Sequence, residues 1–193
     1  MFKSVALLTL LLSAAIAVPT PTENLLPRAC TTRAPSVIDI LKDTTPNTAS
    51  IGQYFNLERT SSPLKNTKLS ALTFNNIPAG ATGCRLEVAF PPLGPNSIAT
   101  GDVQAEFWST DPWNVNTAPT FNNPPRKREM VGTYRFPTAA NDQSTHTVIA
   151  SNTCSETMSW LAYLSDWQQN AGSVAFNNRL DIQNMGFSLV FNC

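Results

Sequence analysis

Residues 72–92 read LTFNNIPAGATGCRLEVAFPP, and this stretch decides the fold class because it contains two strand patterns joined by a turn. Its middle, residues 75–80, supplies the Asn, Pro and Gly residues that favour tight turns. From residue 84 to residue 90 the side chains alternate between two faces, as in a half-buried strand, until Pro91 ends the pattern. One face carries Cys84, Leu86, Val88 and Phe90, and the other carries Arg85 and Glu87.

The chain beyond residue 30 repeats this pattern of short apolar segments separated by turns. The pattern predicts an all-β fold, an antiparallel β-sandwich or jelly-roll-like arrangement of about ten short strands in a single domain, residues 30–193. The expected strands are 37–41, 53–59, 68–75, 84–90, 102–110, 130–136, 145–151, 158–167, 173–178 and 186–192.

Residues 158–167 fit two patterns. Helical spacing relates Trp160, Leu161, Leu164 and Trp167, whereas strand spacing relates Met158, Trp160, Ala162 and Leu164. We interpret the segment as a strand, because the segments on both sides of it continue the β pattern. Trp160 and Trp167 are then expected in the core.

The first 17 residues have the features of a secretory signal peptide. Lys3 supplies the basic start, residues 5–16 form the apolar stretch, and residues 15–17 form a cleavage site of small residues. Residues 18–29 are polar and rich in proline, which predicts a flexible leader, and whether it is trimmed stays open. No later segment is long and apolar enough to span a membrane, so we expect a secreted, extracellular protein.

The charge balance excludes several kinds of partner. The chain carries 13 basic and 13 acidic residues, and removal of the signal peptide takes away only Lys3. A net charge near zero argues against a nucleic-acid-binding surface and against electrostatic binding to a membrane. A single histidine and widely spaced cysteines match no metal-site pattern, so we expect no metal and no cofactor.

Four cysteines, an even number, predict two disulfides in an oxidising compartment. The four residues are Cys30, Cys84, Cys154 and Cys193, and three connectivities are possible. Cys84 and Cys193 both occupy inward positions of expected strands, which favours the pairs Cys84–Cys193 and Cys30–Cys154.

Residues 111–129 are the longest segment without a strand pattern, and loops of this length are usually functional or disordered. Exposed aromatic residues on a rigid sheet can stack on sugar rings or anchor a protein partner. The candidate binding residues are Trp108, Trp113, Phe121, Arg126, Lys127 and Arg128. For the aromatic residues the favoured alternative is that they fold back and cap the open end of the sandwich. For the basic run the alternatives are a processing-protease site, which Lys127-Arg128 resembles, and a solvated loop.

Catalysis has few candidate residues. A Ser-His-Asp triad would have to use His146, the only histidine, with Asp142 as the nearest carboxylate in sequence, and the chain has no G-x-S-x-G motif. Glycoside hydrolysis needs two carboxylates at a set separation, and the outward-facing Glu87 and Glu106 could face one cleft. Acidic residues on the outer face of a strand are ordinary, so we expect no catalytic site.

The chain resembles the fungal But-two C-terminal domain family, named after a protein that binds a ubiquitin-like modifier. The resemblance runs from about residue 30 to residue 193 and rests on residues 73–78 (TFNNIP), 84–91 and 186–193 (GFSLVFNC). It implies a β-rich secreted fungal domain, with members often linked to the cell surface or wall, and it supplies no catalytic residues. The ubiquitin-like partner is intracellular, so that function is not transferred to a chain with a signal peptide.

Together these observations lead to one expected function and one alternative. The expected function is that of a secreted, non-catalytic fungal protein, a cell-wall-associated or extracellular interaction module for an unknown protein or glycan ligand. The alternative is a secreted glycan-binding or glycan-active protein similar to a glycoside hydrolase.

Overall fold

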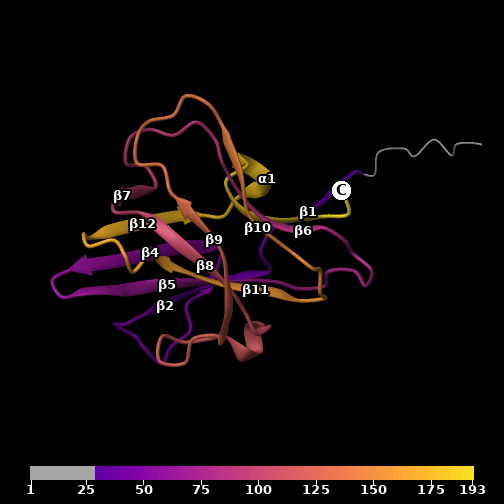
Figure 1. Ribbon diagram of the computed structural model, residues 1–193, viewed down its shortest axis with the longest axis horizontal. Helices are drawn as coiled ribbons and strands as arrows, with labels where there is room; N and C mark the ends of the chain where they lie inside the picture. Colours follow the sequence, from indigo (N-terminus) through magenta and orange to yellow (C-terminus); the bar gives the residue numbers. More distant parts are fainter. Residues whose placement is uncertain (1–28) are drawn as a thin grey trace, which may run out of the picture.

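The computed structural model describes residues 29–193, so the expected signal peptide and nearly all of the expected leader lie outside the described residues. Within residues 29–193 the chain forms thirteen β-strands and one short α-helix, all strand pairings are antiparallel, and the predicted all-β sandwich is confirmed (Figure 1). None of the helices in this part of the chain is long and apolar enough to cross a membrane.

Two sheets form the two layers of the sandwich. The smaller sheet has four strands in the order β1 (Thr31–Arg33), β13 (Gly186–Phe191), β6 (Cys84–Phe90) and β10 (Thr145–Asn152). The larger sheet runs in the order β7 (Ala99–Gly101), β12 (Gly172–Asn177), β4 (Tyr54–Ser61), β5 (Leu64–Phe74), β11 (Met158–Leu164), β8 (Gln104–Thr110) and β9 (Lys127–Arg135). It also contains β2 (Val37–Lys42), which pairs with β5 and with β3 (Ile51–Gly52). A 3-10 turn (Val115–Thr117) lies between β8 and β9, and α1 (Leu180–Gln183) precedes β13.

All ten expected strands are present, with shifted ends. The bounds of β6 agree with the alternation in residues 84–90, and 158–167 is a strand as expected but ends at Leu164. The two strands of residues 72–92 lie in different sheets, so the turn between them carries the chain from one layer to the other. The short strands β1, β3 and β7 were not expected, because two or three residues are too few to show alternation.

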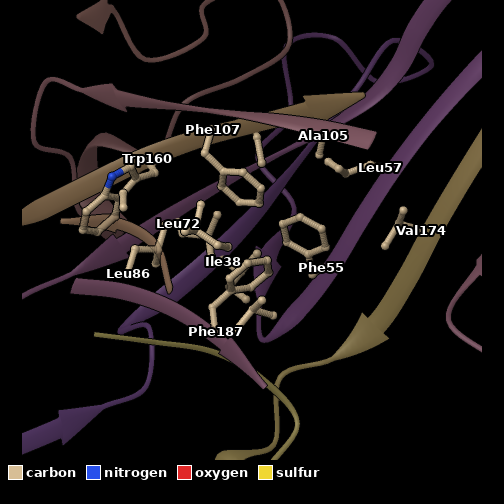
Figure 2. Packing of buried hydrophobic residues seen from close by; sticks show 14 of the residues in the cluster. Ile38, Phe55, Leu57, Leu72, Leu86, Ala105, Phe107, Trp160, Val174 and Phe187 are labelled. Atoms are coloured by element: carbon tan, nitrogen blue, oxygen red, sulfur yellow. The ribbon is translucent and has the colours of Figure 1, made fainter. Parts of the chain in front are cut away.

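The core lies between the sheets and is dominated by aromatic side chains. Figure 2 shows Phe55, Phe107 and Phe187 close together, with Trp160 at one end of the labelled group. The ring centroids of Phe55 and Phe187 are 4.7 Å apart, and those of Phe107 and Phe187 are 5.6 Å apart. All four side chains are at most 1% exposed. Full burial of a phenylalanine stabilises the fold by about 1.5–3 kcal/mol relative to exposure, so this group is a main source of stability.

The outer face of the larger sheet is also partly covered. A second apolar cluster gathers there, with Trp113 packed on the strands beneath it. Its buried members are Val37, Leu41, Ala71, Trp113, Leu161 and Tyr163. The segment between β8 and β9 lies beside β2 in Figure 1, and the N–H of Asn122 in this segment donates to the carbonyl of Pro46 at 2.9 Å. All seven residues of β11 are therefore buried, which explains why its sequence also resembled a helix.

The disulfides join Cys30 to Cys193 and Cys84 to Cys154, so two disulfides form but the favoured pairs Cys84–Cys193 and Cys30–Cys154 are wrong. Strand register explains the difference. Pairing of β13 with β6 places Val190 beside Arg85, so Cys193 extends past Cys84 and meets the start of β1 instead. Pairing of β10 with β6 places Asn152 beside Cys84, and Cys154 follows two residues later.

Candidate functional site

A cleft of about 570 Å³ opens at one end of the sandwich, where four strands begin or end. It lies between the end of β8, the start of β9, the end of β10 and the connection from β10 into β11. The lining residues are Ser109, Thr110, Pro112, Arg128, Glu129, Ser151, Asn152, Thr153, Ser155, Thr157, Met158, Ser159 and Trp160. Its volume lies in the usual range of about 300–1,000 Å³ for sites that bind small ligands.

Hydroxyl groups dominate the lining of this cleft. Seven of the lining residues are serine or threonine, and only Arg128 and Glu129 carry charge. Each hydroxyl donates one hydrogen bond and accepts others, so the lining can pair with a ligand that is itself rich in hydroxyls. Met158 and Trp160 are buried and supply an apolar floor.

Two lining residues contain buried polar atoms without a hydrogen-bond partner among the described residues. They are the indole nitrogen Nε1 of Trp160 and the amide oxygen Oδ1 of Asn152. An unpaired buried polar group costs about 1–3 kcal/mol.

The wall formed by the start of β9 is held in place by the residues that precede it. The side chain of Arg128 forms an ion pair with Asp111, with Nε 2.6 Å from Oδ1. The backbone N–H of Asp111 donates to the carbonyl of Arg126 at 3.1 Å, and the Oγ of Ser109 donates to the carbonyl of Glu129 at 3.3 Å. The two ends of the β8–β9 segment are thus joined at the cleft, and they position Arg128 on its rim.

A cluster of charged and aromatic side chains occupies the outer face of the larger sheet beside this segment. The ammonium Nζ of Lys127 lies 4.5 Å from the centroid of Trp108 and 4.9 Å from that of Tyr163, which are cation–π distances. It also donates to the Tyr163 hydroxyl at 3.1 Å, and the indole N–H of Trp108 donates to Glu106 at 2.9 Å. Lys127 and Trp108 therefore contact each other within the protein.

The phenol of Tyr163 provides a test of this cluster. Burial raises its pKa above the ordinary value of 10.0, and the hydrogen bond with Glu106 acts in the same direction. The folded state therefore binds this proton more tightly than the unfolded state does. The contribution of the protonated Tyr163 to the free energy of unfolding is fully present below about pH 10 and is lost as the pH rises through the folded-state pKa.

We expect Tyr163→Phe to remove a phenol that titrates above pH 10 in an ultraviolet difference titration and to reduce the loss of stability in alkali. Tyr54→Phe is the control, because Tyr54 is exposed. A Tyr163→Phe titration that loses a phenol of ordinary pKa would contradict the burial of this hydroxyl beside Glu106.

The structure separates the six residues expected to bind a ligand. Arg128 lies on the rim of the cleft, and Lys127 and half-buried Trp108 belong to the cluster beside it. Phe121 packs on the second apolar cluster and Arg126 is exposed. Trp113 is 5% exposed, so its ring is buried as the favoured alternative had it, but it covers the outer face of the larger sheet rather than the open end of the sandwich. Residues 127–129 are in strand β9 rather than in the loop.

Glu87 and Glu106 do not face one cleft. Glu87 lies on the outer face of the smaller sheet, where Oε2 is 2.6 Å from Nε2 of His146 and Oε1 is 3.1 Å from Nε of Arg85. Glu106 lies on the outer face of the larger sheet, on the opposite side of the sandwich. The carboxyl groups of glycosidases are about 5–10 Å apart, so these two cannot flank one glycosidic bond.

The wall formed by residues 151–159 was not identified from the sequence, although these residues show a recognisable pattern. Hydroxyl residues occupy every second position of this segment. They are Ser151, Thr153, Ser155, Thr157 and Ser159, and all five line the cleft. The apolar alternation used to find strands does not register a row of hydroxyls.

Comparison with known proteins adds no assignment. No protein-family model matches the chain, and a search of curated proteins finds no significant match.

Proposed function

We propose that the protein is a secreted, non-catalytic binding protein for a glycan, which it holds in the cleft between the ends of β8 and β10 and the start of β9. The observation that carries this proposal is the set of seven serine and threonine residues that line the cleft. A glycan presents hydroxyls along its length, and hydroxyl–hydroxyl pairing needs no net charge. The balanced charge of the chain fits a neutral polymer.

The cellular setting belongs to the same proposal. The two disulfides suit an oxidising compartment, and the signal-peptide pattern of residues 1–17 suits export. The resemblance to the fungal But-two C-terminal domain family favours attachment to a cell wall or cell surface. The glycan would then be a wall polysaccharide. The separation of Glu87 from Glu106 favours binding over hydrolysis.

The test removes hydroxyls from the rim without changing its shape. We expect the double variant Ser151→Ala and Thr153→Val to weaken glycan binding by about tenfold, because each lost hydrogen bond is worth about 0.5–1.5 kcal/mol. Titration calorimetry with laminarihexaose, chitohexaose and mannohexaose measures the change. The control is Thr44→Val, an exposed threonine outside the cleft lining.

Three results would count against the proposal. Parent protein that binds none of the three oligosaccharides would refute glycan binding. Release of reducing sugar by the parent would refute the non-catalytic part, and Glu87→Gln and Glu106→Gln would then test the carboxylates. Equal affinity in the parent and the double variant would place the ligand elsewhere.

A further inference from the structure

Trp167 is the exposed aromatic residue that the sequence placed in the core. The prediction is wrong because β11 ends at Leu164, and Trp167 lies in the loop of residues 165–171 that leads into β12. Its side chain is 56% exposed. The other three tryptophans of the chain are half-buried or buried.

The loop is held from the strand on one side by a buried arginine. The guanidinium of Arg59, which is 2% exposed, donates from Nη1 to the carbonyl of Ser165 and from Nε and Nη2 to the carbonyl of Asn170 at 3.0 and 2.9 Å. The side-chain amide of Asn66 donates to the carbonyl of Leu164 at 2.9 Å and to Asp166 at 3.1 Å. Both ends of the loop are thus tied to β4 and β5.

The start of β8 holds the loop from the other side. The N–H of Ser165 donates to the carbonyl of Gln104 at 2.8 Å, and the N–H of Gln104 donates to the side chain of Gln168 at 3.0 Å. The carboxylate of Asp102 accepts from the side-chain amide of Asn170 at 2.9 Å. These hydrogen bonds hold the backbone of the loop in place, and the indole of Trp167 lies exposed on it.

The surroundings of the indole match a sugar better than a protein. Trp167 offers one flat apolar face, and the exposed side chains beside it are the hydrogen-bonding Asp166, Gln169 and Asn170. No second large apolar side chain of the loop is exposed, and a stable protein interface covers about 800 Å² on each partner around an apolar centre. One pyranose ring needs only a single aromatic face and a few polar neighbours.

A groove of about 570 Å³ has Ala171, the last residue of this loop, in its lining. Its lining includes the hydroxyl residues Thr60, Ser61, Ser62, Thr100 and Ser173. A polysaccharide with one sugar ring stacked on the indole could place its next sugars along these hydroxyls.

We propose that Trp167 and the groove beside it form a second carbohydrate site, in which a pyranose ring of a polysaccharide stacks on the indole. The proposal does not rest on the cleft at the other site, because no lining residue is shared between the two. A rigid loop loses little conformational freedom on binding, which favours affinity from a small contact. Two sites on one molecule would strengthen binding to a polymer through avidity.

The test uses the full secreted protein with insoluble β-1,3-glucan, chitin and mannan in sedimentation assays. We expect Trp167→Ala to weaken binding to the preferred polymer by about tenfold or more, and Trp167→Phe to retain most of it. The control is Ile182→Ala, an apolar side chain that is 72% exposed on α1. Acrylamide quenching of tryptophan fluorescence should fall when laminarihexaose or chitohexaose is added, because the sugar would cover the most exposed indole.

The outcomes separate the two sites. Unchanged polymer binding by Trp167→Ala, with binding lost in the cleft variant Ser151→Ala and Thr153→Val, would overturn the second site and leave the cleft standing. The reverse pattern would support the second site and refute the cleft. A parent protein that binds no polymer would overturn both sites. Both would also be overturned if no oligosaccharide changed the quenching and if both variants bound the polymer as the parent does.

Discussion

Replacement of Trp113 by alanine is expected to lower the free energy of unfolding by about 3–5 kcal/mol, the usual cost of removing a buried tryptophan or phenylalanine side chain. Trp113 is 5% exposed and packs on Leu161 and Tyr163 on the outer face of the larger sheet. Its removal would also open this apolar cluster to water. Urea unfolding of the parent and of Trp113→Ala measures the difference.

The backbone at Trp113 explains why its position is fixed. The hydroxyl of Thr73 donates to the Trp113 carbonyl at 2.9 Å, and the hydroxyls of Thr73 and Ser159 lie 2.8 Å apart. Both hydroxyls are buried on neighbouring strands, β5 and β11. These hydrogen bonds tie the loop to the sheet independently of the indole, and the indole covers the face beneath it.

Trp167→Ala is the matched control, because it removes the same side chain from an exposed site. We expect this variant to change stability by no more than about 0.5 kcal/mol. Trp113→Phe should lower the free energy of unfolding by less than half as much as Trp113→Ala does, since a phenyl ring fills much of the same space. Equal urea midpoints for Trp113→Ala and the parent would contradict the role of this residue as a cap.

Local patterns in the sequence predicted local structure well. The alternation in residues 84–90, ended by Pro91, predicted strand β6 at its observed ends. Alternation reports which residues share a face, and both Leu86 and Val88 are in the core as expected. Proline and glycine also act locally, because they restrict or free the backbone at their own position.

The pattern of one strand does not say what covers its outer face. Leu161 and Tyr163 occupy the outward positions of β11, and an apolar outward face means that another segment lies over it. The sequence contained that signal, since Trp113 and Phe121 are in the one long segment able to reach it. No pattern in the sequence indicated that Trp167 is exposed, because its loop is held by hydrogen bonds from Arg59, which lies on a strand far away in the sequence.

Disulfide pairing and site assembly are set by strand order, which a single sequence does not contain. Cys84 and Cys193 share an inward position in the sequence pattern, yet antiparallel register places them two residues apart along neighbouring strands. The hydroxyl row of residues 151–159 becomes a site only because β8 ends and β9 begins beside it. Both facts follow from which strands are neighbours in space.

Removal of the Cys84–Cys154 disulfide is expected to lower the free energy of unfolding by about 4 kcal/mol. The chain-entropy model gives this value for a bridge that spans a sequence separation of 70 residues, because the bond restricts the unfolded chain. Cys84 is 1% exposed at the start of β6. The double variant Cys84→Ala and Cys154→Ala, compared with the parent by urea unfolding, measures the loss.

The same bond also holds a wall of the glycan cleft. Cys154 lies between Thr153 and Ser155, which both line the cleft, so we expect the variant without Cys84–Cys154 to bind laminarihexaose or chitohexaose more weakly as well. The matched control is Cys30→Ala with Cys193→Ala. That bridge spans a separation of 163 residues, and neither cysteine lines the cleft.

The control should therefore lose stability, by about 5 kcal/mol in the same model, while its folded fraction keeps the oligosaccharide affinity of the parent. Binding is measured at a temperature where each variant is still folded, so that the two effects are read separately. Loss of affinity in both disulfide variants would mean that the cleft responds to global stability rather than to the anchoring of residues 151–159. Full affinity without Cys84–Cys154 would mean that the wall is held by its strands alone.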